Sequence, residues 1–103
     1  MTQYHKLVRD KIPAIIQAQG EIPHIRILEG EEYTRRLEEK LDEEVAEYHS
    51  DKNLAELADI LEVVYALTEN LGHTQEELLE VYREKHDKRG GFRDRVFLIS
   101  KEG

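Results

Sequence analysis

The sequence of 103 residues lacks cysteine and tryptophan and contains only two prolines. Without cysteine, disulfide bonds, thiolate-ligated zinc and thiol catalysis are all excluded, which fits a reducing cytoplasm. Long apolar runs are also missing, because Asp59 and Glu62 interrupt the most apolar stretch, residues 57–67. The sequence therefore predicts a cytoplasmic protein without a signal peptide or a membrane span.

Positive charge is scarce as well. The chain carries 15 basic and 23 acidic side chains, for a net charge of −8. Proteins that bind nucleic-acid polymers usually carry an excess of positive charge, which this chain does not have. We therefore expect no nucleic-acid partner. Carboxylates dominate residues 29–62, whereas basic side chains gather between Arg83 and Arg95. An acidic patch beside a basic one suits a metal ion bound together with an anionic ligand.

The periodicity of the apolar residues predicts an all-α fold within one domain, residues 1–103. Asp10 is placed to cap the first helix, and Thr74 with Glu77 forms a capping box for the last. The expected helices span residues 10–20, 30–48 or 49, 54–71 and 74–89. Because the break at residues 50–53 is short, the second and third helices should form an antiparallel hairpin.

Two segments outside these helices have the composition of short strands, and residues 22–28 also alternate apolar and polar side chains. Residues 22–28 and 95–100 are rich in β-branched and aromatic side chains and read as short strands. They allow a small two-stranded ribbon beside a four-helix bundle. A chain this short buries a modest share of its surface alone, so we expect oligomerisation to complete the core.

The chemistry that we predict for the hairpin of the second and third helices depends on five carboxylates. At 100° per residue, Glu44 projects between two apolar positions of the second helix, and Asp59 shares a face with apolar residues of the third. The complete set is Glu43, Glu44, Glu47, Glu56 and Asp59. Acids in apolar stripes cost several kcal/mol unless a cation neutralises them, typically about 3–5 for a buried charge left alone. The alternative is a set of exposed salt bridges, with Lys40 and Lys52 among the partners.

The ligand type selects the cation. All-oxygen donors without histidine or cysteine favour Mg²⁺, with Mn²⁺ as the alternative. Magnesium keeps waters and shares its coordination with phosphate oxygens, which points to a phosphoanhydride substrate. Water would attack a phosphorus atom, and Glu44 or Glu47 would orient or deprotonate that water.

Cations must also face the phosphates, because carboxylates alone would repel a triphosphate. Lys85 and Arg89 lie one turn apart near the end of the last helix and are the first choice. Arg9 and Lys11, near the first helix, are the second choice. For Lys85 and Arg89, a simple interaction with the helix C-terminus is an equally good explanation.

The acidic motif resembles the signature of the MazG-like, all-α nucleoside triphosphate pyrophosphohydrolases. It consists of Glu43-Glu44-x-x-Glu47 followed by Glu56-x-x-Asp59. The flanks, residues 6–13 and 85–92, are similar to the ends of the compact phosphoribosyl-ATP pyrophosphohydrolase-like subgroup. One departure from the family pattern is the very short connection between the two acidic halves.

The resemblance implies Mg²⁺-dependent hydrolysis of an NTP or dNTP, canonical or not, to the monophosphate and pyrophosphate, as in house-cleaning enzymes. It further implies a homodimer or homotetramer, with the five acids as metal ligands and Lys85 and Arg89 near the phosphates. One alternative is the phosphoribosyl-ATP reaction of histidine biosynthesis. The other is a helical regulator that binds a nucleotide without hydrolysing it.

Overall fold

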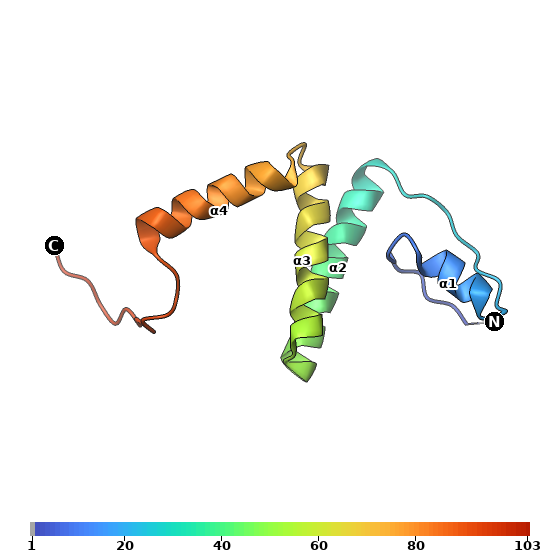
Figure 1. Cartoon of the computed structure of the whole chain (residues 1–103), viewed down its shortest axis with the longest axis horizontal. Helices are drawn as coiled ribbons and strands as arrows, with labels where there is room; N and C mark the ends of the chain where they lie inside the picture. Colours follow the sequence, from blue (N-terminus) through green and yellow to red (C-terminus); the bar gives the residue numbers. More distant parts are fainter. Residues whose placement is uncertain (1) are drawn as a thin grey trace.

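The protein is all-helical, as expected from the sequence. A computed structural model describes residues 2–103, and Met1 of the predicted domain 1–103 lies outside the described residues. The helices are α1 (Ile12–Ala18), α2 (Gly30–Asp51), α3 (Leu54–Asn70) and α4 (Gln75–Arg89), and residues 2–103 contain no strand (Figure 1). None of these four helices combines the length and the apolar character that crossing a membrane requires.

The start of α1 differs from the prediction. Asp10 was expected to cap this helix, but Lys11 occupies the N-cap position and its side chain makes no capping hydrogen bond. The chain enters the helix through a turn in which the Ile12 N–H donates to the Arg9 carbonyl at 3.0 Å. This turn moves the first helical residue beyond the reach of an Asp10 cap, and Pro13 in the first turn needs no N–H partner.

Helices α2 and α3 form the predicted antiparallel hairpin, with α2 extending to Asp51 rather than ending at Tyr48 or His49. Lys52 adopts the left-handed conformation (φ 47°) and its N–H donates to the Tyr48 carbonyl at 2.8 Å. Asn53 then caps α3 by accepting a hydrogen bond from the Glu56 N–H at 3.0 Å. A two-residue connection therefore reverses the chain.

The best-packed part of the protein lies between these two helices. Leu37 of α2 and Val63 of α3 are the buried apolar side chains among the described residues, and Thr68 is buried with them. Near the open end of the hairpin, the Asn70 amide donates to the Thr34 hydroxyl at 2.9 Å. This narrow core holds the hairpin together, while α1 and α4 stand apart from each other on either side of it (Figure 1).

The isolated chain is elongated. Its extents are 63 × 32 × 22 Å and its radius of gyration is 18.2 Å, against about 13 Å for a compact domain of this length. Residues 22–28 and 95–100, which read as strands, are irregular, and they lie toward opposite ends of the molecule (Figure 1). The ribbon that the sequence allows is therefore not formed within one chain.

Candidate metal centre

The hairpin places acids from both helices on one side of the core. Glu44 follows Leu37 by two helical turns on α2, so it continues the buried face. Asp59 precedes Val63 by one turn on α3, and Glu56 lies one turn before Asp59. The local helical repeat thus aims these three carboxylates toward the same point between α2 and α3.

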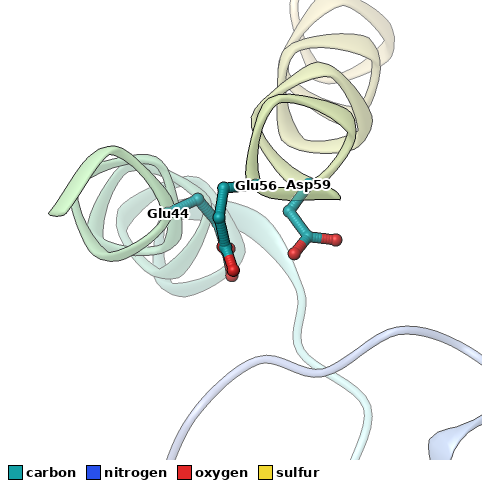
Figure 2. Close-up of side chains that lie close together, drawn as sticks. All are labelled: Glu44, Glu56 and Asp59. Atoms are coloured by element: carbon teal, nitrogen blue, oxygen red, sulfur yellow. The ribbon is translucent and has the colours of Figure 1, made fainter. Parts of the chain in front are cut away.

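Glu44, Glu56 and Asp59 come together in the structure. Each offers a carboxylate oxygen, and these oxygens all lie within 4.8 Å of one another. Figure 2 shows the three carboxyl groups turned to the same side of the helix pair, where the N-terminal segment passes. Glu44 is only 9% exposed. The salt-bridge alternative has support as well, because Lys40 Nζ lies 3.3 Å from a carboxylate oxygen of Glu43 and of Glu44.

A second group joins the first through Glu56. Oxygens of Glu47, Asp51 and Glu56 also lie within 4.8 Å of one another, on a more exposed part of the surface. Asp51 was not among the acids predicted from the sequence, because the second helix was expected to end before it. Its position one turn after Glu47 becomes informative once α2 is known to extend to Asp51.

Glu43 lies next to this cluster and contacts two lysines instead of the other acids. Its carboxylate oxygens lie 3.3 Å from Lys6 Nζ and 3.3 Å from Lys40 Nζ. Partial burial acts to raise the pKa of Glu43, but Lys40 and then Lys6 outweigh it, so this pKa lies below its ordinary value. Of the five predicted ligands, Glu43 is the one outside both groups of converging oxygens.

Glu56 has the opposite electrostatic environment. Desolvation raises its pKa, and the negative charges of Asp51, Asp59, Glu47 and Glu44 raise it further. The charged form of Glu56 is therefore disfavoured by its neighbours. A bound cation would reverse this effect.

Two cations contact the first group of acids. Arg9 Nη2 lies 2.6 Å from Asp59 Oδ1, and Lys40 Nζ lies 3.3 Å from Glu44 Oε1. Both cations and both acids border a cavity of about 270 Å³ between the N-terminal segment and the hairpin. Tyr33 and Tyr65 line the same cavity. The arrangement combines acidic oxygens, two basic groups and aromatic rings in one hollow.

The other predicted phosphate-binding residues lie elsewhere. Lys85 and Arg89 are exposed on α4, which packs against α3 alone among the helices of residues 2–103. Lys11 is exposed and does not line the cavity. Within a single chain, Arg9 is therefore the predicted basic residue that reaches the acids, and Lys6 and Lys40 join it without having been predicted as phosphate ligands.

Comparison with known proteins adds little to this geometry. No protein-family profile and no solved structure matches the chain. An uncharacterised protein of Mycolicibacterium smegmatis is 57% identical over 42 residues. The match covers 41% of this chain and 43% of that protein, so less than half of the relative is spanned.

Proposed function

We propose that this protein is a Mg²⁺-dependent nucleoside triphosphate pyrophosphohydrolase of the MazG-like type. The observation that carries the proposal is the convergence of Glu44, Glu56 and Asp59. Glu44 and Asp59 also line a cavity together with Arg9 and Lys40. The MazG-like resemblance of the acidic motif agrees with this assignment. We further propose a cytoplasmic location, which the absence of cysteine favours.

The donor set fits a hard divalent cation. Its oxygens are close enough to share one ion, and no sulfur or imidazole ligand competes. The neighbouring acids that raise the pKa of Glu56 would be neutralised by such a cation. Glu44, Glu56 and Asp59 would hold Mg²⁺, with Glu47 and Asp51 extending the site toward solvent, and Mn²⁺ would substitute for it.

In the reaction, water adds to phosphorus as the bond to the bridging oxygen breaks, and monophosphate and pyrophosphate are formed. Bound Mg²⁺ would supply charge neutralisation of the phosphates and acidify the attacking water. Among the residues of the chain, Glu44 or Glu47 would accept the proton of that water. Arg9 and Lys40 would contact phosphate oxygens, since both already border the cavity.

The proposed active form is a homodimer or homotetramer. The chain exposes 9604 Å², whereas a compact protein of its mass exposes about 6,000 Å². An apolar groove of about 330 Å³ between α3 and α4 is lined by Leu61, Val64, Tyr65, Leu78, Leu79 and Tyr82.

The test is hydrolysis of a panel of NTPs, dNTPs and modified nucleotides with Mg²⁺ and with Mn²⁺. We expect monophosphate and pyrophosphate as first products. Glu44→Ala and Asp59→Ala should abolish turnover while Glu38→Ala, an exposed acid on the same hairpin, retains it. Orthophosphate as the first product would contradict the assigned bond. Preferential turnover of phosphoribosyl-ATP would instead identify the histidine-pathway reaction, and nucleotide binding without any product would identify a regulator.

A further inference from the structure

Two exposed apolar segments remain outside the candidate metal centre and the α3–α4 groove. We call residues 22–28 the arm and residues 96–101 the tail. Ile25 and Ile27 of the arm are 63% and 80% exposed, and Phe97 and Ile99 of the tail are 86% and 89% exposed. Apolar segments rich in β-branched and aromatic residues pair well as strands but are costly to leave in water.

Both segments also leave their backbone groups unpaired. Among residues 2–103, no backbone hydrogen bond involves residues 22–28 or 96–101. The arm connects α1 to α2, and the tail follows α4 at the opposite end of the 63 Å long molecule (Figure 1). Because the hairpin separates them, a second copy is the partner that can bring a tail to an arm without refolding the chain.

The sequences of the two segments match in one antiparallel register. When Ile27 is set opposite Phe97, Ile25 falls opposite Ile99, so two successive cross-strand pairs on one face are apolar. The same register sets Glu29, just past the arm, opposite Arg95, just before the tail. An acid therefore meets a base where the apolar pairs end. An antiparallel ladder is preferred because parallel pairing is less stable and is usually buried on both faces.

We infer that two copies of this chain exchange these segments, the arm of each pairing with the tail of the other as an antiparallel two-stranded ribbon. A two-fold axis generates two such ribbons from one interaction. The exposed area supports a second copy as the occupant, since the chain exposes roughly 3,600 Å² more than a compact protein of its mass. A stable interface needs about 800 Å² from each partner. This inference rests on the self-association proposed above and specifies which segments meet.

The experiment uses the absence of cysteine from the chain. Two differently tagged full-length chains, one carrying Ile27→Cys and the other Phe97→Cys, are co-expressed, purified and mildly oxidised. We expect a disulfide between the two tags, because directly opposite residues in an antiparallel ladder lie within disulfide range. The matched control replaces Phe97→Cys with Leu98→Cys, which is similarly exposed but projects from the other face of the ribbon. Cross-linking at 97 should exceed that at 98 by at least about fivefold.

A charge exchange supplies an independent measurement. In sedimentation experiments, Glu29→Lys should weaken the dimer, and the double variant Glu29→Lys/Arg95→Glu should restore it. Equal cross-linking at 97 and 98 would overturn the exchange. So would a disulfide formed within one monomeric chain by Ile27→Cys/Phe97→Cys. A dimer that forms without the 27–97 cross-link would overturn the ribbon while leaving pairing through the groove. None of these measurements requires nucleotide hydrolysis. A negative result would therefore contradict the segment exchange without contradicting the proposed hydrolase activity.

Discussion

Glu56 belongs to both groups of converging carboxylates, and this position determines how it responds to pH. Its pKa is raised, so between its unfolded and folded pKa values the folded chain binds more protons than the unfolded chain. The stability of the metal-free protein should therefore fall as pH rises through that interval, which begins near the ordinary value of 4.5. Above the folded pKa, the charged carboxylate continues to destabilise the fold.

Glu56→Gln removes this charge and should raise the thermal midpoint of the metal-free protein at neutral pH. The same substitution should remove most of the stabilisation that Mg²⁺ provides, because a ligand is lost. Thermal unfolding with and without Mg²⁺ measures both effects. Glu38→Gln on the exposed side of α2 is the control, and it should change neither. A fall in the metal-free midpoint of Glu56→Gln would show that its charge is compensated in a way that this structure does not contain.

Arg9 is paired with Asp59 across 50 positions of sequence. If Arg9 neutralises Asp59 until Mg²⁺ and phosphate are bound, Arg9→Ala should strengthen Mg²⁺ binding by the free protein. It should also lower kcat/KM by at least about tenfold, since a charged contact to phosphate is worth roughly 1.5–3 kcal/mol. Metal titration and steady-state kinetics separate the two effects. Lys11→Ala, which alters a nearby cation outside the cavity, should do neither, and an equal loss in that variant would argue against Arg9.

At the scale of elements, α4 has the best-defined start of the four helices. The Thr74 hydroxyl accepts from the Glu77 N–H at 3.1 Å, while the Thr74 N–H donates to the Glu77 carboxylate at 3.0 Å. This backbone contact, followed by the contact with His73, lowers the pKa of Glu77 below 4.5. The stabilisation from charged Glu77 is thus fully present above pH 4.5 and is lost as pH falls through the lower, folded pKa.

We therefore expect Thr74→Ala to destabilise the protein by about 1 kcal/mol at neutral pH, the usual cost of losing such a cap. Glu77→Gln should reduce the loss of stability on acidification below pH 4.5, because its contact no longer titrates. Chemical denaturation at neutral and acidic pH measures both changes. Glu76→Gln, an acid in the same first turn without a capping hydrogen bond in the described chain, is the matched control. The capping account fails if both glutamine variants have the same pH dependence.

At the scale of the whole molecule, the chain has too little core for its length. Large apolar side chains remain exposed along α3 and α4, including Leu61 at 48% and Tyr82 at 59%. Both line the apolar groove, whose other walls are leucine, valine and tyrosine side chains. An exposed apolar groove favours a protein–protein contact, so we expect the second copy of the proposed oligomer to bind there first.

Leu61→Asp should shift the protein toward monomer, because a charge would be desolvated at the groove. Sedimentation over a range of protein concentrations measures the dissociation constant, which we expect to rise by at least about tenfold, a change of 1.4 kcal/mol. Leu71→Asp introduces the same charge at an exposed residue just after α3 and outside the groove. Equal dissociation in both variants would show that net charge rather than the groove controls association.

Short-range signals predicted most of the helices well. Thr74 and Glu77 predicted the start of α4, and the short break after α2 predicted the α2–α3 hairpin. The convergence of Glu44, Glu56 and Asp59 was also predictable, since residues three, four or seven apart share a helix face. The ends of α1 and α2 were less accurate, because a turn at Arg9 and a left-handed Lys52 depend on the local backbone geometry.

By itself, the sequence determined the all-helical class, the hairpin and the face on which three acids meet, because each follows from the helical repeat and from caps a few residues away. Only the tertiary structure decided which basic residues reach these acids: Arg9 contacts Asp59, and Lys6 contacts Glu43. It also brought Asp51 next to Glu47 and Glu56. Within one chain, it placed Lys85 and Arg89 on a helix that does not approach the acids. These relations join segments far apart in sequence. They depend on how the helices pack and on which surfaces stay exposed. The helical repeat of 3.6 residues alone does not predict such contacts.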